Sequence, residues 1–399
     1  MGMFEAPGGA DALRLTARRI VNQCNAEIFF EVSPLLEENW TGIPVVAAGL
    51  ARSLLVALPD QIRFFHGTEE VAPEPVKDAL DRGTGIFLQY DFYHGQARRG
   101  PVRRGSHAKK TLGIYPSTKS SRRVFDVECS IVHDISTLIT PQFHTAENIL
   151  HHGEKLLDDI ASNDVTFCVS QATAADMTAY LGTPSARLAV AYAGVAWAPE
   201  HLDCAEAEID FDAIEPYFAI LGSRDPRKNL ALIVELLRNF PDLLNVHRFI
   251  FTGAFNDPQD IARLDPNLAS AIAGDRISFT GFISDAQKCK LLMAAHASIY
   301  PSFFEGFGLP VIESLSVGTP CIASCSSSLP EIGGPNCHYF DPYSVIDLYR
   351  ALTEFQRNHP KRDPAFARAC RGSVAGFNWP NMAHGMLRRI EREIRGGDG

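Results

Sequence analysis

The sequence lacks several features that would narrow its class at once. It has no apolar run long enough to span a bilayer, and no secretory signal is recognisable at its start. Its nine cysteines are scattered and show no metal-like pairing. No Gly-x-Gly-x-x-Gly follows an early strand, which argues against a nicotinamide-dependent dehydrogenase. These absences favour a cytoplasmic location, with reduced and mostly buried thiols.

Negative charge is missing from one stretch. The whole chain carries a net charge of −10, which argues against nucleic acid as its main partner. Between Gly95 and Arg123, however, there is no aspartate or glutamate. The cations of this basic stretch are Arg98, Arg99, Arg103, Arg104, Lys109, Lys110, Lys119, Arg122 and Arg123. Its glycine, serine and proline content predicts a loop, which is either simply solvated or attracted to an anionic membrane surface.

The chain does contain a repeated alternation of short apolar strands and helices. Its 399 residues, 46% of them hydrophobic, suffice for two domains. Alternation of this kind predicts an α/β fold with parallel, doubly wound sheets, here two Rossmann-like domains facing across a cleft. The expected division is an N-terminal extension over 1–25, a first domain over 26–198, an acidic linker over 199–216, a second domain over 217–380 and a final helical segment over 381–399.

The strongest functional signal is the segment Glu305–Glu313, Glu-Gly-Phe-Gly-Leu-Pro-Val-Ile-Glu. It follows an apolar strand-like run, and its glycines allow the backbone to approach a ligand closely. Pro310 suits the first turn of a helix. The unpaired N–H groups at such a helix start, together with its dipole, suit a phosphate. Carboxylates on either side of a phosphate site would accept hydrogen bonds from hydroxyls, one from a sugar and the other from a ribose.

This spacing of Glu305 and Glu313 resembles the donor-site signature of the family-4 retaining glycosyltransferases, and the resemblance extends from about residue 27 to residue 379. It implies the GT-B architecture, with an acceptor-binding first domain, a nucleotide-sugar-binding second domain and a last helix that crosses back to the first. It further implies that Glu305 contacts the transferred hexose and Glu313 the nucleotide ribose. The donor-binding residues between them would be Gly306, Phe307, Gly308 and Leu309.

A second signal lies between Gly222 and Asn229, where a strand ends and a helix begins. Cations at a helix start are unfavourable unless an anion neutralises them, and a pyrophosphate would do so. The Pro-Arg-Lys-Asn sequence here resembles the family's phosphate-binding segment. Lys228 matches its lysine, and either Arg224 or Arg227 matches its arginine.

Three further positions carry weaker signals. His133 ends an apolar strand, where open α/β sheets bind ligands. A lone histidine there is more often a satisfied core residue, but Ile-Val-His-Asp resembles the family's histidine beside the transferred sugar, in a chemical or a positional role. Gly42, after the first strand, resembles the glycine of the family's N-terminal loop. The loop around Phe282 resembles the one that carries the nucleotide base, and Ser328–Glu331 resembles another segment near the donor.

Together these resemblances imply a retaining glycosyltransferase whose catalytic residues are His133, Lys228 and Glu305. It would move a hexose from a nucleotide sugar to a hydroxyl of a glycan or lipid-linked acceptor, without a cofactor. Sequence around His133 and Lys228 is similar to bacterial mannosyl- and rhamnosyltransferases of surface polysaccharides, so GDP-mannose is the first expectation for the donor. The enzyme would be cytoplasmic, and peripheral at the inner face of the membrane if the basic stretch binds there.

No metal site is predicted. Asp210-Phe211-Asp212 matches a metal-binding pattern of another glycosyltransferase fold, but it lies in the acidic linker, where no strand presents it. Two alternatives to the transferase stay open at this level. One is a sugar-nucleotide epimerase or a phosphorylase on the same architecture, and the other is a catalytically idle donor-binding protein. Fold alone does not decide among them.

Overall fold

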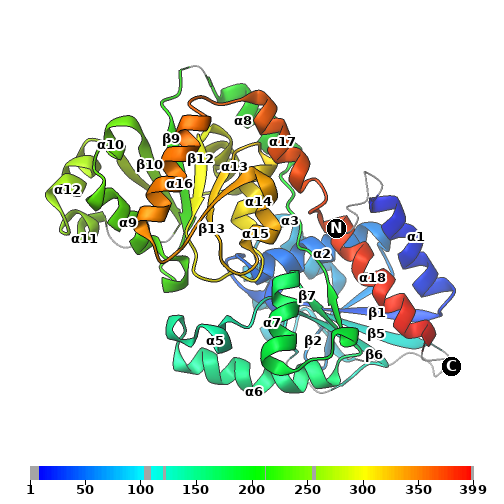
Figure 1. Cartoon of the computed structure of the whole chain (residues 1–399). Helices are drawn as coiled ribbons and strands as arrows, with labels where there is room; N and C mark the ends of the chain where they lie inside the picture. The colour runs from blue at the N-terminus through cyan, green and yellow to red at the C-terminus, as the bar shows by residue number, and fades with distance from the viewer. Residues whose placement is uncertain (1–8, 103–108, 120–122, 212, 254–257, 397–399) are drawn as a thin grey trace. The chain divides into compact units, whose positions relative to one another are not determined.

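The computed structural model describes residues 9–102, 109–119, 123–211, 213–253 and 258–396. It divides the chain into two compact units (Figure 1). Unit 1 comprises residues 1–194 and 376–399, and unit 2 comprises residues 195–375. Each unit is built around a sheet of its own, and each is described by itself below.

The sheet of unit 1 has eight strands among the described residues, in the order β4-β3-β2-β1-β5-β6-β7-β8. From β2 to β8 the neighbouring strands pair in parallel, as expected for a doubly wound sheet. β3 pairs antiparallel with β2 and β4, which adds an edge that the sequence did not predict. The strands are β1 (Ala26–Glu31), β2 (Ile62–His66), β3 (Glu69–Val71), β4 (Arg98–Pro101), β5 (Lys110–Tyr115), β6 (Val127–Val132), β7 (Val165–Cys168) and β8 (Leu188–Val190).

An aromatic cluster fills part of the core of unit 1. Phe29, Phe65, Tyr115 and Phe125 pack together, and the ring centroids of Phe29 and Phe125 lie 4.7 Å apart. Gly113 passes beneath this cluster, and a Cβ there would lie 2.3 Å from the Phe125 ring. The helices of unit 1 are α1 (Gly9–Asn22), α2 (Ile43–Ala57), α3 (Pro73–Arg82), α4 (Ile86–Tyr93), α5 (Ser136–Ile139), α6 (Ala146–Ser162), α7 (Gln171–Leu181) and α18 (Trp379–Gly396), with the 3₁₀ turns η1 (Ser33–Leu36), η2 (Pro141–Phe143) and η3 (Ser185–Arg187).

The first helix is an integral part of unit 1. Leu13, Ala17 and Ile20 of α1 are buried, because α1 packs against α18 and α2. The guanidinium of Arg19 donates to both carboxylate oxygens of Glu391 on α18, each at 3.1 Å. The expectation that residues 1–25 form a mere extension was therefore wrong for the described residues 9–25. The apolar face of α1 is covered largely by the last helix, which is distant in sequence.

The sheet of unit 2 is parallel throughout, in the order β11-β10-β9-β12-β13-β14. Successive side chains of β9 point to opposite faces, as in any strand. Phe218 and Ile220 pack into a core with α9 and α16, while Ala219 and Leu221 pack into another with α13. Figure 1 shows α9 and α16 on one face of this sheet and α13 and α14 on the other. This is the doubly wound arrangement that the sequence predicts.

The elements of unit 2 follow in chain order. Its strands are β9 (Tyr217–Gly222), β10 (Arg248–Gly253), β11 (Ile277–Gly281), β12 (Ala297–Tyr300), β13 (Cys321–Ser324) and β14 (Cys337–Phe340). Its helices are α8 (Pro199–Glu208), α9 (Leu230–Asn239), α10 (Leu243–Val246), α11 (Pro258–Ala262), α12 (Pro266–Ala273), α13 (Asp285–Ala294), α14 (Leu309–Ser316), α15 (Leu329–Gly333), α16 (Val345–Asn358) and α17 (Pro364–Val374), with the 3₁₀ turns η4 (Pro226–Lys228) and η5 (Gly334–Asn336).

The segment 199–216 is not the irregular linker that its acidic composition suggested. It contains helix α8, whose Ala205 is buried, and α8 packs against α13. Leu202, Ile209 and Ile214 pack against the same core. Acidic residues lie between these apolar residues in the sequence. The overall composition of the segment therefore looks acidic and gives no indication of its buried apolar face. The segment belongs to unit 2, whereas residues 376–380 belong to unit 1.

The basic stretch is also more ordered than expected, because β4 and β5 lie within it. Its described cations find partners inside unit 1. Lys119 is buried against Glu128 at 2.8 Å. The others are engaged as Arg98 with the Phe92 carbonyl, Arg99 with Glu74, Lys109 with Glu27, Lys110 with the Ile394 carbonyl and Arg123 with Asp164. Arg103, Arg104 and Arg122 lie outside the described residues.

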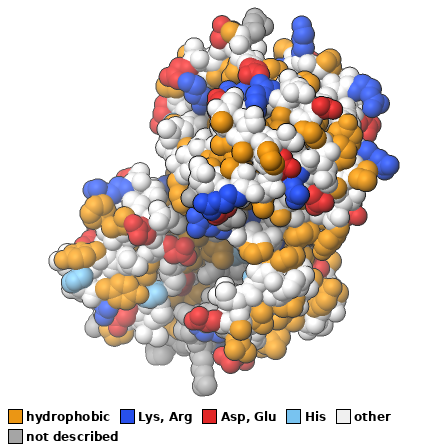
Figure 2. All heavy atoms as spheres, turned by 90° about the vertical axis from the view of Figure 1, so that its left-hand side faces the viewer, with side chains coloured by type: hydrophobic (Ala, Val, Ile, Leu, Met, Phe, Trp, Pro, Cys, Tyr) orange, Lys and Arg blue, Asp and Glu red, His pale blue; other side chains and the backbone are white. Residues whose placement is uncertain are grey.

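The surface carries charges of both signs. On the face shown in Figure 2, Lys and Arg side chains are interspersed with Asp and Glu, and hydrophobic side chains lie scattered between them. The net charge is therefore not gathered into one acidic field on this face. Among the described residues, no helix combines the length and the apolar character that crossing a bilayer requires.

Candidate functional site

The predicted anion site is a real turn between strand and helix. Strand β12 ends at Tyr300, and α14 begins after Gly308, whose φ of 100° lies in the left-handed region. A Cβ at Gly308 would lie 2.6 Å from Cδ2 of Leu329, so both the backbone and the space require glycine. The hydroxyl of Ser328 donates to the carbonyls of Glu305 and Phe307, each at 2.9 Å. The turn is therefore held from the neighbouring helix α15.

Three polar side chains meet below this turn and form the Lys228–Tyr300–Glu305 cluster. Nζ of Lys228 donates to Oε1 of Glu305 at 2.8 Å and to the Tyr300 hydroxyl at 2.9 Å. The Tyr300 hydroxyl donates to the same oxygen of Glu305 at 2.9 Å. Lys228 comes from η4 after β9, and Glu305 follows β12, which is the neighbour of β9 in the sheet. The cluster thus lies at the carboxyl edge of the sheet, where ligands of open α/β sheets bind.

Both charges of the cluster are present at neutral pH. Burial by itself would raise the pKa of Glu305, but Lys228 and Arg227 outweigh this and hold the pKa below its usual value. Burial likewise would lower the pKa of Lys228, but the charge of Glu305 raises it above its usual value. The side chain of Glu305 is 8% exposed and that of Lys228 is 20% exposed. The pair is therefore a nearly desolvated ammonium and carboxylate, fixed in direction by Tyr300.

The structure distinguishes the two candidate arginines. Arg227 lies beside the cluster, with Nη1 at 4.0 Å from Oε2 of Glu305 and at 3.4 Å from the Phe304 carbonyl. Asp225 orients it through an ion pair at 3.3 Å. Arg224 is exposed in the preceding turn. Of the two, Arg227 is the one that shares an environment with Lys228 and Glu305.

Asn229 fixes the segment that carries these cations. Its backbone is left-handed, with a φ of 53°, and its side chain is buried. The amide Nδ2 donates to the carbonyl of Pro301 at 3.1 Å and to that of Pro342 at 2.8 Å. It therefore ties the turn after β9 to the turn after β12, so that Lys228 and Glu305 stay in register.

Glu313 lies away from this cluster, on helix α14, as its spacing predicts. Its Oε1 accepts from Nζ of Lys288 at 2.8 Å, and its side chain is 14% exposed. Lys288, on α13, also lies 5.3 Å from the ring centroid of Trp197 and 3.6 Å from Asp285. The two glutamates of the motif thus have separate cationic partners. Phe282, in the loop between β11 and α13, is 79% exposed and offers a flat surface.

The remaining predicted residues belong to unit 1. His133 follows β6, and its Nε2 donates to the Pro116 carbonyl at 2.8 Å. Burial lowers the pKa of His133, so the ring is neutral at pH 7 and its Nδ1 is an acceptor. Gly42 precedes α2 with a φ of 60°, and a Cβ there would meet nothing within 4 Å. The residue is required for its backbone conformation alone.

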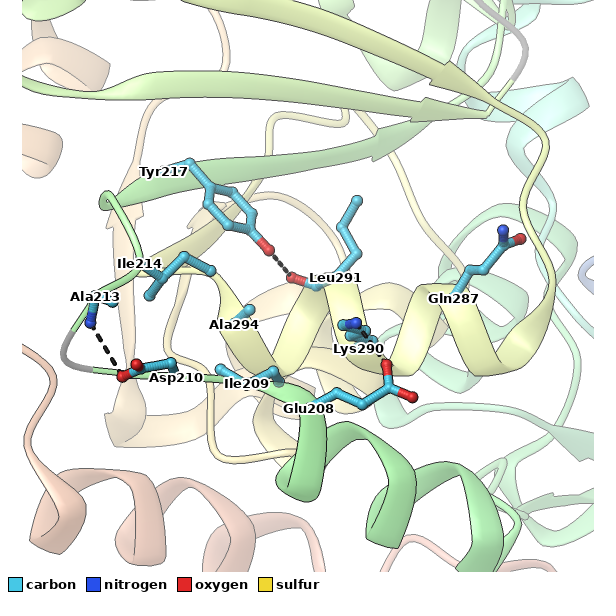
Figure 3. Close-up of a pocket in the computed structure, with 10 residues that line it drawn as sticks. All are labelled: Glu208, Ile209, Asp210, Ala213, Ile214, Tyr217, Gln287, Lys290, Leu291 and Ala294. Atoms are coloured by element: carbon cyan, nitrogen blue, oxygen red, sulfur yellow. Dashed lines mark hydrogen bonds and ion pairs between the residues drawn. The ribbon is translucent and has the colours of Figure 1, made fainter.

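An open cavity of unit 2 lies elsewhere. Its volume is about 480 Å³, and Figure 3 shows it between the segment after α8 and helix α13. Tyr217, at the start of β9, lines it, so it faces the amino edge of the sheet rather than the edge that carries Glu305. Asp210 also lines it, but the Asp210 carboxylate accepts from the Ala213 N–H at 3.2 Å, which closes a turn. Asp212 lies outside the described residues.

Sequence reasoning missed three members of the site. Tyr300 reads as the apolar end of a strand, and only the fold shows its hydroxyl beside Glu305. Lys288 reads as one more surface lysine of an amphipathic helix. Asn229 has a local signal, because asparagine tolerates left-handed backbone at a helix start, although its two long-range acceptors are invisible in sequence.

Comparison with known proteins agrees with this geometry. Residues 206–369 match the model of the "Glycosyl transferases group 1" family, a range that contains the Lys228–Tyr300–Glu305 cluster and Glu313. The chain is 24% identical over 383 residues to the O-antigen chain mannosyltransferase B of Escherichia coli, covering 89% of this chain and 97% of that protein. It is 26% identical over 269 residues to the Escherichia coli serotype-specific mannosyltransferase WbdA, but the match covers only 32% of WbdA.

Solved structures show the same architecture. WaaG, a glycosyltransferase involved in lipopolysaccharide biosynthesis, aligns with a TM-score of 0.59 at 14% identity, over 90% of this chain and 99% of WaaG. Anabaena HepE, solved in complex with UDP and glucose, aligns with a TM-score of 0.58 at 14% identity, over 92% of this chain and 99% of HepE. The chain therefore carries a Glycosyl transferases group 1 domain on a GT-B fold, and it is a glycosyltransferase.

Proposed function

We propose that the enzyme is a retaining mannosyltransferase that moves mannose from GDP-mannose to a hydroxyl of a glycan or lipid-linked acceptor. The observation that carries the proposal is the Lys228–Tyr300–Glu305 cluster beside the turn that opens α14. It puts a cation, a carboxylate and a helix start at one edge of one sheet. A sugar joined to a diphosphate matches this arrangement: its hydroxyls donate to the carboxylate, and its phosphates are attracted to the cation and the helix start.

The chemistry requires stabilisation of the leaving diphosphate, which gains charge as the bond from C1 to oxygen breaks. Lys228 and Arg227 supply positive charge, and the first turn of α14 supplies N–H dipoles. These groups are held in place by Asn229, Asp225 and Ser328, so little reorganisation is needed. Preorganised charge of this kind is usually the largest catalytic contribution.

In this scheme Glu305 positions the hexose. Its carboxylate stays ionised, so it accepts hydrogen bonds from sugar hydroxyls while Lys228 and Tyr300 fix its orientation. Glu313 accepts from the ribose hydroxyls, and Phe282 offers a stacking surface to the base. His133, a neutral acceptor at Nδ1, orients the sugar or stabilises positive charge on its ring. No divalent cation is assigned, because Arg227 and Lys228 take the charge of the diphosphate.

The choice of mannose is supported by the relatives, which are named as mannosyltransferases at modest identity. A thermal-shift comparison of GDP-mannose with UDP-glucose and ADP-glucose tests it. A ligand that binds the folded state stabilises it by RT ln(1 + [L]/Kd), so the true donor should raise Tm most.

Transfer from GDP-mannose in EDTA, followed by NMR of the anomeric proton, tests the metal-free and retaining mechanism. Inversion at C1, or activity restored only by magnesium or manganese, would contradict it.

A further inference from the structure

A second polar cluster lies in unit 1, at residues that no motif singled out. It consists of Glu31, the last residue of β1, His66, the last residue of β2, and Ser33 in η1. Oγ of Ser33 lies 2.6 Å from Nδ1 of His66, and Oε1 of Glu31 lies 3.5 Å from the same nitrogen. Oε1 of Glu31 also accepts from the Ser33 hydroxyl and, at 3.0 Å, from the Ser33 N–H. We refer to these residues as the Glu31–Ser33–His66 cluster.

The directions of these hydrogen bonds follow from the chemistry of the groups. An ionised carboxylate only accepts, so the Ser33 hydroxyl donates its proton to Glu31. The Ser33 oxygen must then accept from His66, which places the ring proton on Nδ1. The other ring nitrogen, Nε2, faces away from Ser33 and Glu31, and the edge-on contact with Phe92, 4.8 Å between centroids, holds the ring in place. Among the described residues, Nε2 has no hydrogen-bond partner.

The cluster lies where unit 1 is expected to bind a ligand. β1 and β2 are parallel neighbours, so Glu31 and His66 share the carboxyl edge of the sheet. His133, at the end of β6, lies on the same edge, since the strand order runs β2-β1-β5-β6. Glu31 is nearly buried, with a side-chain exposure of 5%, whereas the side chain of His66 is 28% exposed. A buried carboxylate and a serine thus orient one partly exposed ring, whose Nε2 is left for a ligand.

We propose that Nε2 of His66 accepts a hydrogen bond from a hydroxyl of the sugar acceptor. His66 is then an acceptor-binding residue, and Ser33 and Glu31 are positioning residues that fix its tautomer and its ring plane. The ligand class is a polyhydroxylated saccharide, whose hydroxyls donate readily to an imidazole nitrogen. The inference rests on the proposed function, because it assumes that unit 1 holds the acceptor of a sugar transfer.

Two variants of His66 separate this role from a structural one. The amide of His66→Asn can replace Nδ1 and keep the contact with Ser33, whereas the amide of His66→Gln reaches the position of Nε2.

Transfer from GDP-mannose to octyl α-mannoside is measured for each variant, with KM determined for donor and acceptor separately. His66→Asn should raise the acceptor KM about tenfold, the effect of one lost hydrogen bond, and leave the donor KM unchanged. His66→Gln should recover most of the loss. His94→Asn, an exposed histidine of unit 1, is the matched control.

The outcomes are distinct. Ser33→Ala should also raise the acceptor KM, because the His66 ring then lacks the hydroxyl that orients it. If His66→Asn keeps the acceptor KM of the wild type while His66→Gln loses stability, the cluster is structural and the inference is overturned. If the wild-type enzyme neither hydrolyses GDP-mannose nor transfers from it, the proposed function fails, and the inference falls with it.

Discussion

Glu305 has its charge balanced by Lys228 within the protein itself, and Tyr300 fixes the geometry of the pair. If Glu305 binds the sugar as proposed, its carboxylate would do so without first losing a shell of bound water. Its partner Lys228 depends on it equally, because a nearly buried ammonium without a counter-ion is costly. Substitutions of Glu305 should accordingly affect activity and stability together.

Glu305→Gln is expected to reduce transfer by roughly two orders of magnitude while nucleotide binding survives. It should also lower the free energy of unfolding, because Lys228 is left with a neutral partner. Tyr300→Phe is the matched control, since it removes two hydrogen bonds, one to Glu305 and one from Lys228, and no charge, for about 2 kcal/mol. Kinetics with calorimetry of nucleoside diphosphate binding measure both effects. If Glu305→Gln abolishes nucleotide binding, its assignment to the hexose is wrong.

Glu313 should behave differently, because it lies on α14 with Lys288 as its own partner. Glu313→Gln is expected to weaken binding of the nucleoside diphosphate about tenfold, the effect of losing a charged acceptor for the ribose hydroxyls. Turnover at saturating donor should change much less. Asp285→Asn removes the other, exposed partner of Lys288 and serves as control. Equal loss of binding in both variants would assign the effect to Lys288 instead of the ribose.

Among the elements, β6 and α6 share a buried ionic group with the segment that follows β5, and this group stabilises unit 1. Lys119 lies 2.8 Å from Glu128 and 3.9 Å from Asp159, and the three side chains are at most 1% exposed. Burial raises the pKa of Asp159 to about 6, although Lys119 opposes the rise. One cation therefore serves two carboxylates, and no second cation of this group could replace Lys119.

Lys119→Met should destabilise the protein by about 3–5 kcal/mol, because two buried carboxylates would lose their only described cation. Lys109→Met provides the comparison: that lysine is 49% exposed beside Glu27, and such surface pairs contribute about 0–1 kcal/mol. Urea unfolding of both variants gives the difference. A loss below about 1 kcal/mol for Lys119→Met would show that Glu128 and Asp159 become protonated at little cost.

In unit 2, acid sensitivity is expected from the histidines packed around Phe218. Burial, together with the nearby His296 and Arg276, lowers the pKa of His247 to about 4. The pKa of His247 in the folded state lies below the ordinary value of about 6.5. The contribution of neutral His247 to the free energy of unfolding is therefore fully present above pH 6.5 and is lost as the pH falls towards 4. His247 alone would contribute up to about 3 kcal/mol of that loss. His247→Phe should flatten the fall in unfolding free energy between these pH values, as followed by urea titration. An unchanged fall would exclude His247 as its cause.

For the whole molecule, most of the architecture could be predicted from the periodicity of apolar residues and from the glycine and proline residues at the ends of strands and helices. The parallel strands β1, β9 and β12 were predicted because apolar runs end there in glycine or a turn. The Lys228 and Glu305 segments could be predicted as site elements because each follows such a strand. Strand β5 was missed, since Lys109 before it and Lys110 at its start made it part of a basic loop, and their partners Glu27 and Ile394 are distant in sequence. Clusters such as Glu31–Ser33–His66 depend on strand order, which spacing along the chain does not reveal.

The basic stretch allows a last test on the whole enzyme. Its six described cations have partners within unit 1, so the test addresses the three others, Arg103, Arg104 and Arg122. Each cation near an anionic surface contributes about 1 kcal/mol, so three give weak and reversible binding. Cosedimentation with phosphatidylserine vesicles at low salt should be detectable, should disappear as the Debye length shortens, and should be absent with phosphatidylcholine alone. Replacing the three arginines with serine should abolish it, while Arg99→Ser, which removes an arginine already paired with Glu74, should have little effect. Binding that survives the triple replacement, or high salt, would exclude this stretch as the membrane contact.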